Sequence, residues 1–418
     1  MTSPPTKRWR PWSDRSFVAL VGAIAVLLSS LTAASAFGDE GGDSPERELQ
    51  SVEEIRRADA SSYAADHKVD VEEALRRLDA QAGLGDLADQ IRQHHDDVLA
   101  GIWIEHEPAH KLVVWTTADR PAIRALVAAV EGIEVELRSG ARTTYADAID
   151  AMTREAVRFS DVPGLDGYLI DERTGELVLH VGGVGEGVAT PLADQAAAEF
   201  SERTGIPARV ESASTSADDG HTYGGNNLSS CTSGFVVKNS IGTRGYATAG
   251  HCNDTQTFFE FGGGSYSTTA TSEVRNASTD IQWATTTHSE YPEFYANSTT
   301  ARRTLKAQKF RSSTIVGDYV CHRGKSTGYS CGDIDNISYV PNDPDACPGT
   351  CSPVWILVKG PNLECYPGDS GGPFFNWQTA YGFYKGQSSS GTSASDCTHA
   401  YFMSSTYLSN LGVSYVFG

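Results

Sequence analysis

The first 230 residues of this 418-residue chain contain no cysteine, and all eight cysteines lie beyond them. Basic residues are also scarce, because 33 Lys and Arg stand against 53 Asp and Glu, a net charge of -20. Nucleic acids and anionic membranes bind clustered Lys and Arg, so we expect neither as a partner of the mature protein. No pair of C-x-x-C motifs is present, and we expect no metal site.

The acidity belongs to the N-terminal half. Residues 37–218 carry 17 Lys and Arg against 37 Asp and Glu, a net charge of -20, whereas residues 219–418 carry 12 against 15, a net charge of -3. The change in charge therefore coincides with the change in cysteine content. We predict two regions that meet at residues 218 and 219.

The N-terminus has the pattern of a secretory signal peptide. Basic residues within positions 7–10 precede an apolar run over 17–31, and Ala34-Ser35-Ala36 offers a small-residue cleavage site. A membrane anchor would need about 20 apolar residues, which this run does not reach. We predict a signal peptide over residues 1–36 and a secreted, extracellular protein whose cysteines form disulfides.

The composition and hydrophobic pattern of residues 37–218 predict an acidic, cysteine-free α+β region. Helical spacing dominates residues 46–100, and strand-like runs on both sides of residues 107–110 predict a hairpin turn there. The elements predicted after it are a helix at 121–130, a strand at 133–137, a helix at 145–159, strands at 168–170 and 177–181, a helix at 192–203 and a strand at 206–210. Residues 212–225, rich in Ser, Ala, Asp and Gly, then predict an exposed linker.

Three motifs in residues 219–418 carry side chains suited to nucleophilic catalysis. They are Gly250-His251-Cys252 after a run of small residues, Thr279-Asp280-Ile281 at the start of an alternating strand, and Gly368-Asp369-Ser370-Gly371-Gly372. A serine hydroxyl is a weak nucleophile until an imidazole takes its proton and a buried carboxylate orients that imidazole. We predict His251, Asp280 and Ser370 as a catalytic triad, with the amides of Gly368 and Ser370 as the oxyanion hole. In α/β-hydrolase esterases the catalytic histidine follows the serine in the chain, whereas His251 precedes Ser370, so the order of the motifs does not fit that class.

These motifs resemble the bacterial chymotrypsin-like serine proteases of the streptogrisin and alpha-lytic protease group. The similarity runs from about Thr222 to Gly418 and includes Cys231-Thr232-Ser233-Gly234-Phe235 and the segment from Val320 to Gly332. The resemblance implies an all-β domain of two packed six-stranded antiparallel β-barrels with the site in the cleft between them. It also implies a monomeric endopeptidase that forms an acyl-enzyme on protein or peptide substrates, without a cofactor, and whose own pro-region helps it to fold and then inhibits it.

The same resemblance implies the pairing of most cysteines. It gives disulfides Cys231–Cys252, Cys321–Cys331 and Cys365–Cys397, and leaves Cys347 and Cys351 to bridge each other. The residues alone leave many pairings of eight cysteines open.

The chain departs from the family pattern around the primary specificity pocket. One residue fewer than in the streptogrisins lies between Cys365 and Ser370, and Lys385 stands where the family commonly has serine. By resemblance, the substrate-binding residues are Tyr366 on one wall and Tyr384, Lys385 and Gly386 on the opposite wall. The two tyrosines lead us to expect cleavage after uncharged side chains, whereas Glu364 beside Cys365 would attract Lys or Arg if its carboxylate reached the pocket floor.

A buried acid of the serine motif also has an expected partner. In the family, the equivalent of Asp369 pairs with a buried base that follows the cysteine at Cys321. His322 or Arg323 would take that role here.

Two alternatives stay open on the sequence. A catalytically inactive homologue would bind proteins through the same cleft, and Lys385 and the shortened loop favour it. Residues 37–218 would alternatively form an independent binding domain that remains attached.

Overall fold

The described part of the chain starts with three helices. This computed structural model describes residues 49–418 except 160–161, 163–164, 182–190, 213–224, 262–264, 287–289, 344 and 346. The predicted signal peptide and the predicted boundary at residues 218 and 219 lie outside these residues. The first helices are α1 (Val52–His67), α2 (Val71–Gly83) and α3 (Gly85–His94). A capping box starts α1, in which the Ser51 side chain accepts from the Glu54 N–H and the Glu54 carboxylate accepts from the Ser51 N–H at 2.8 Å.

Two small α+β units follow, as the sequence predicts. The first contains β1 (Leu99–Glu105), β2 (Lys111–Thr116), α4 (Pro121–Val127), β3 (Glu134–Ser139) and α5 (Tyr145–Phe159). The second contains β4 (Leu165–Asp171), β5 (Glu176–Val181), α6 (Pro191–Thr204) and β6 (Ala208–Ser212). Each unit pairs its first two strands antiparallel and its last two parallel, so both have the same strand-strand-helix-strand pattern.

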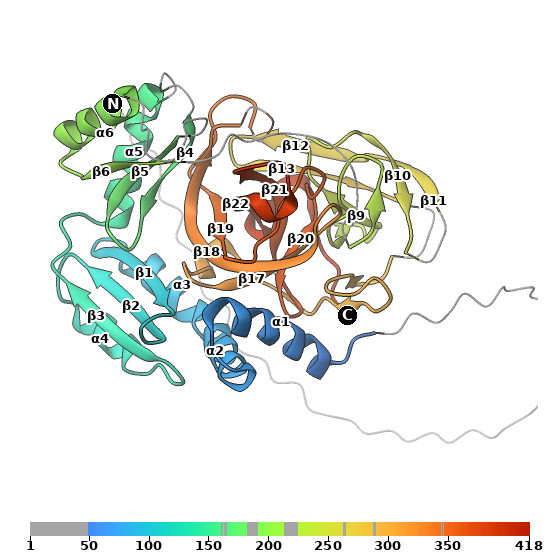
Figure 1. Cartoon of the computed structure of the whole chain (residues 1–418), viewed down its shortest axis with the longest axis horizontal. Coiled ribbons are helices and arrows are strands. Elements are labelled where there is room, and N and C mark those ends of the chain that lie inside the picture. Colours follow the sequence, from blue (N-terminus) through green and yellow to red (C-terminus); the bar gives the residue numbers. More distant parts are fainter. Residues whose placement is uncertain are drawn as a thin grey trace, which may run out of the picture. The chain divides into compact units, whose positions relative to one another are not determined.

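A closed antiparallel barrel forms the C-terminal part of the chain. Its strands are β17 (Tyr319–Gly324), β18 (Gly328–Pro341), β19 (Trp355–Lys359), β20 (Pro373–Asn376), β21 (Thr379–Ser389) and β22 (Cys397–Ser404). They pair in the order β17-β20-β21-β22-β19-β18, and β17 also pairs with β18, which closes the ring (orange to red in Figure 1). Buried aromatic rings fill it, with Phe374 stacked on Phe402 at 4.5 Å between centroids. This barrel is the six-stranded one that the resemblance implies.

The other predicted barrel is a half-barrel instead. One sheet has the order β11-β10-β7 and the other has the order β12-β13-β9-β8-β23. The bounds are β7 (Asn227–Leu228), β8 (Val236–Asn239), β9 (Arg244–Thr248), β10 (Thr255–Phe259), β11 (Ser265–Thr269), β12 (Ser272–Asn276), β13 (Thr279–Ala284) and β23 (Val413–Tyr415). Within the described residues no strand pairing joins the two sheets, so the expectation of a second closed six-stranded barrel is corrected.

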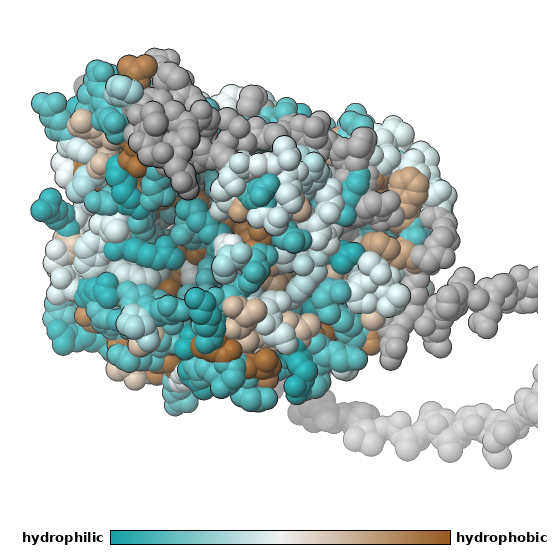
Figure 2. All heavy atoms as spheres, in the orientation of Figure 1, coloured by the Kyte–Doolittle hydropathy of each residue, from teal (hydrophilic) through white to brown (hydrophobic). Residues whose placement is uncertain are grey.

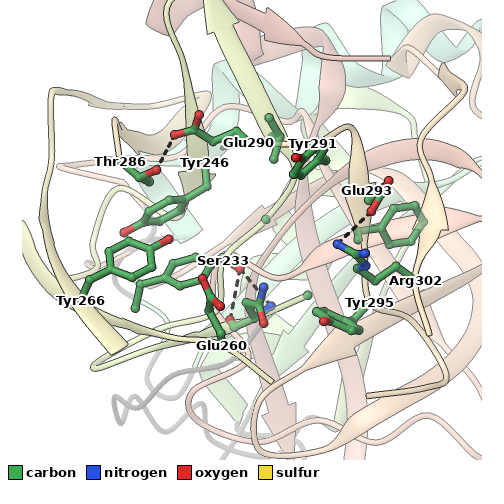
Figure 3. A pocket seen from close by; sticks show the side chains of 16 residues that line it. Ser233, Tyr246, Glu260, Tyr266, Thr286, Glu290, Tyr291, Glu293, Tyr295 and Arg302 are labelled. Carbon is green, nitrogen blue, oxygen red and sulfur yellow. Dashed lines mark hydrogen bonds and ion pairs between the residues drawn. The ribbon is translucent and has the colours of Figure 1, made fainter. Parts of the chain in front are cut away.

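Aromatic side chains lie between these two sheets and explain why they meet face to face. Tyr246 of β9 packs on Phe258 of β10 at 5.2 Å, and Phe258 stacks on Tyr266 of β11 at 5.0 Å. A pocket of about 250 Å³ opens beside them. Figure 3 shows Tyr246 and Tyr266 on one side of this pocket and Arg302, paired with Glu293 at 3.0 Å, on the other. None of the predicted catalytic residues lines it.

Short elements complete the described chain. They are β14 (Glu293–Phe294) paired with β15 (Arg303–Thr304), β16 (Ala307–Gln308) paired with β21, and 3-10 turns at Arg311–Ser313, Ala394–Asp396 and Ser405–Leu411.

The N-terminal α+β region docks on the closed barrel through a continuous sheet. β18 extends past the barrel and pairs antiparallel with β4, where Val340 faces Tyr168 and Pro341 faces Gly167. The barrel sheet therefore continues into β4, β5 and β6 (Figure 1). Residues 47–418 accordingly cluster as one compact unit.

A buried ion pair joins the two regions at α1. Arg303 donates two hydrogen bonds to Asp59, at 2.9 and 3.0 Å, and both side chains are fully buried. The Tyr329 hydroxyl and the Trp377 N–H also donate to Asp59, at 2.5 and 2.9 Å. Within the described residues, all four of these hydrogen bonds to the Asp59 carboxylate come from residues beyond position 300.

The surface has no extended apolar face in the view of Figure 2, where hydrophobic side chains are scattered among hydrophilic ones. In the described part of the chain, no helix has the length and apolar character needed to cross a membrane.

Candidate active site

His251 is held at the end of β9 by small residues and a disulfide. A Cβ on Gly250 would lie 2.8 Å from the Ile281 nitrogen and 3.0 Å from Asp280 Oδ1, so only glycine lets the two segments approach this closely. Cys252, the residue after His251, is bonded to Cys231. The imidazole therefore projects beside β13.

Asp280 lies on β13 with its side chain fully buried. His251 Nδ1 is 2.8 Å from Asp280 Oδ2, which is the contact that orients a triad imidazole. Burial opposes ionisation of this carboxyl, but the positive charges of Lys385, His251 and Arg275 outweigh it, so the pKa of Asp280 lies below its ordinary value. The structure thus brings two of the three predicted catalytic side chains together.

Ser370 sits in a loop whose shape depends on glycine. Gly368 and Gly371 have φ values of 108° and 85°, and a Cβ on Gly371 would lie 2.1 Å from Thr248 Oγ1 at the end of β9. Thr232 anchors the loop, because its hydroxyl donates to the Gly368 carbonyl at 2.8 Å and its N–H donates to the Ser370 carbonyl at 2.7 Å. The serine loop is therefore packed against the segment that leads to His251.

The Ser370 hydroxyl does not pair with His251 here. The hydroxyl instead donates a hydrogen bond to the Lys385 carbonyl oxygen, at 3.2 Å between the two oxygens. Among the described residues, the amide N–H groups of Gly368 and Ser370 donate to no protein acceptor. Two unengaged amides beside a serine are what an oxyanion hole requires.

Lys385 contacts His251 and Asp280, which are two of the three predicted catalytic residues. Its ammonium nitrogen lies 2.8 Å from His251 Nδ1 and 3.6 Å from Asp280 Oδ2, and its side chain is only 2% exposed. Sequence reasoning placed Lys385 on the wall of the specificity pocket. A bulge in β21 explains the difference, because Lys385 is the extra residue between Tyr384, which pairs with Phe402, and Gly386, which pairs with Tyr401.

Tyr384 is also misplaced by the sequence-based prediction. Its side chain is fully buried in the closed barrel, stacked on Phe374, and its hydroxyl donates to Gln387 at 2.7 Å. A side chain with no exposed surface does not line an open pocket. Tyr384 therefore does not support the expected cleavage after uncharged side chains. Tyr366 is 40% exposed, and Gly386 pairs with Tyr401 across β22.

Asp369 is held by hydrogen bonds rather than by the bases we expected. Its carboxylate accepts from the Ser326 N–H at 2.9 Å, the Thr327 hydroxyl at 2.9 Å and the Tyr366 N–H at 3.1 Å. The two candidate bases make their hydrogen bonds elsewhere: His322 contacts the Glu364 carbonyl, and Arg323 donates to the Ala296 carbonyl. Burial raises the pKa of Asp369 to about 6.

Four disulfides are present, and they are the ones that the resemblance implies. They are Cys231–Cys252, Cys321–Cys331, Cys347–Cys351 and Cys365–Cys397. The Cys365–Cys397 disulfide joins the two ends of a segment that contains the serine loop.

A histidine cluster where the α+β region meets the barrel was missed. His67, His106 and Asp333 bring ligand-type atoms within 4.8 Å of one another, and the ring of His106 stacks on that of His67 at 4.3 Å. Residues 106–110 spell H-E-x-x-H, a zinc-site pattern, but they form the turn between β1 and β2, whereas that pattern binds zinc from a helix. Both nitrogens of His106 already have partners, Tyr63 and the Gly317 carbonyl, so we interpret the group as an interface cluster.

No protein-family model matches the chain. Among solved structures, a Nocardiopsis protease is 20% identical with a TM-score of 0.38 and covers 48% of this chain and 99% of its own. Protease A of Thermobifida fusca is 24% identical with a TM-score of 0.38, covering 47% and 98%. A Cellulomonas bogoriensis chymotrypsin is 22% identical with a TM-score of 0.36, covering 48% and 98%. These are bacterial chymotrypsin-fold proteases of the streptogrisin-like kind, with which about half of the chain aligns.

Proposed function

We propose that this chain is the precursor of a secreted serine endopeptidase that cleaves peptide bonds through Ser370, His251 and Asp280. The observation that carries the proposal is the 2.8 Å contact between His251 Nδ1 and the buried Asp280, beside a serine with two unengaged amides. Ser370 would attack the peptide carbonyl while His251 takes its proton, and the amides of Gly368 and Ser370 would hold the oxyanion. The His251 proton would then pass to the leaving amine.

Secretion is supported by the four disulfides, which oxidising compartments maintain. The predicted substrates are proteins or peptides, with the enzyme acting as a monomer.

A fluorophosphonate probe tests this assignment, since it labels only an activated serine. We expect labelling of Ser370 and cleavage of casein in assays that cover about pH 5 to about pH 11. Ser370→Ala should abolish labelling and lower turnover by roughly 10⁶. A folded protein that is neither labelled nor active at any pH would instead be the inactive, protein-binding homologue, which the Ser370–Lys385 contact favours.

We also propose that residues 37–218 are a pro-region that assists folding and then inhibits the enzyme. Support comes from β4, which extends the sheet of the enzyme barrel, and from Asp59, whose buried partner Arg303 belongs to the enzyme. A barrel whose strands pair across long sequence distances folds slowly, so a docked template would lower the barrier. Processing would fall within residues 212–222 of the predicted exposed linker, which lie almost wholly outside the described residues.

Refolding separates this role from that of an attached binding domain. Residues 219–418 would be refolded with and without separately made residues 37–218. We expect active enzyme only with the pro-region, and we expect added pro-region to inhibit mature enzyme. Equal recovery of activity would exclude the folding role, and unaffected activity would exclude the inhibitory one.

A further inference from the structure

Lys385 places a second nitrogen against the triad imidazole. His251 Nδ1 has the Asp280 carboxylate oxygen at 2.8 Å and the Lys385 nitrogen at 2.8 Å. A neutral imidazole has one N–H and one lone pair, on different ring nitrogens. An ammonium group only donates hydrogen bonds, so it and an Nδ1–H exclude each other at this distance.

The two contacts therefore demand opposite tautomers. Asp280 favours a proton on Nδ1, which leaves Nε2 free to accept the Ser370 proton. Protonated Lys385 favours a lone pair on Nδ1, which puts the proton on Nε2. The Asp280 carboxylate does not need the imidazole proton for charge balance, because Lys385 lies 3.6 Å from Oδ2 and Arg275 Nε lies 3.4 Å from Oδ1.

We propose that Lys385 is a positioning residue that, while protonated, holds His251 in the tautomer with its proton on Nε2 and so keeps the triad inactive. Loss of the Lys385 proton turns the amine into an acceptor, and a single Nδ1–H then serves both Asp280 and Lys385. The inference rests on the proposed function. It predicts an enzyme that gains activity as Lys385 loses its proton.

Other charged groups lie around His251 and Lys385. On the half-barrel side, Glu273 interacts electrostatically with His251 and Asp280, and also with Arg275 and Asp254. On the closed-barrel side, the nearest carboxyl of the serine loop is Asp369, whose pKa of about 6 places its titration below the alkaline range.

The first test measures the rate constant for labelling of Ser370 by a fluorophosphonate, from about pH 5 to about pH 11. Lys385→Met fills a similar volume without a charge, and Lys385→Arg keeps a charge that does not titrate. In the wild type we expect labelling to rise about tenfold per pH unit on the alkaline side until Lys385 is neutral. In Lys385→Met, labelling at pH 7 should be at least about tenfold faster than in the wild type and show no alkaline rise. Lys385→Arg should stay slow throughout.

The second test observes the tautomer directly, independent of activity. In the Ser370→Ala background, ¹⁵N NMR of ¹⁵N-histidine-labelled protein reports which ring nitrogen of His251 carries the proton, and His251→Gln assigns the signal. We expect Nε2–H with Lys385 present and Nδ1–H in Lys385→Met at pH 7.

The outcomes distinguish this inference from the proposed function. The same tautomer in both proteins, or superimposable pH profiles for wild type and Lys385→Met, would overturn the role of Lys385 and leave the protease assignment intact. A change of tautomer without labelling of any variant at any pH would overturn the protease assignment and leave the tautomer control standing.

Discussion

Asp59→Asn tests the docking of the proposed pro-region at a fully buried ion pair. The substitution keeps the size of the side chain but removes the charge that faces Arg303, and both groups are fully buried. Arg303 would keep hydrogen bonds to Gln50 and Asn297, at 3.1 and 2.8 Å, but no counter-charge within reach of its guanidinium. A buried guanidinium without a carboxylate is costly because the low-dielectric interior does not solvate it.

Removing one partner of a buried pair costs about 3 to 5 kcal/mol. We therefore expect the precursor to lose about that much stability. The matched control is Asp79→Asn in α2, whose pair with Arg56 has side chains that are 31% and 47% exposed. An exposed pair contributes about 1 kcal/mol or less.

Urea unfolding of the precursor in the Ser370→Ala background, which prevents self-cleavage, measures both values. The double variant Asp59→Leu with Arg303→Met should regain most of the loss, since an apolar pair leaves no unpaired charge. If Asp59→Asn costs no more than Asp79→Asn, the ion pair is not buried as described and the docking argument fails.

Two pH effects follow from the described residues. Burial lowers the pKa of His106, and burial together with His106 lowers that of His110 to about 3, so both must be neutral when docked. Precursor stability should therefore be full above about pH 6.5 and decrease as the pH falls below it. The folding equilibrium constant should decrease by up to tenfold per histidine and pH unit. In pH-dependent urea unfolding, His110→Gln should reduce the slope of stability against pH. Asp369 has the opposite sign: its raised pKa stabilises the fold below 3.8, and this stabilisation of about 3 kcal/mol is lost as pH rises through about 6. Asp369→Asn should remove that slope between pH 4 and pH 7, and an unchanged slope would show that another group causes it.

Local patterns predicted the elements of the N-terminal α+β region well. The run from Pro121 forms a helix that ends at Val127 rather than at residue 130, and the turn at residues 107–110 connects β1 to β2. Hydrophobic spacing and turn residues are local properties, so they identify an element and its type. The position of His251 beside Asp280 was also predicted, from motifs whose residue types match one chemistry.

Pairing between distant strands was not predictable in the same way. The sequence of Val413–Tyr415 does not indicate that this segment pairs with β8 of the half-barrel. The sequence of β18 likewise does not indicate that its last residues pair with β4. Alternation shows which side chains share a face but does not select the neighbouring strand. For the same reason the half-barrel was expected to close.

Lys385 illustrates the limit at a single residue. The sequence shows an unusual lysine but not which face of β21 carries it, and a shift of one residue would point it away from His251. A lysine is rarely buried without a partner, because its charge is costly to desolvate. The carboxylate that offsets this cost is Asp280, 3.6 Å away, which is also the group expected to orient the catalytic imidazole. One carboxylate therefore serves a buried cation and the triad at once, so any change at Lys385 alters the electrostatics of His251 as well.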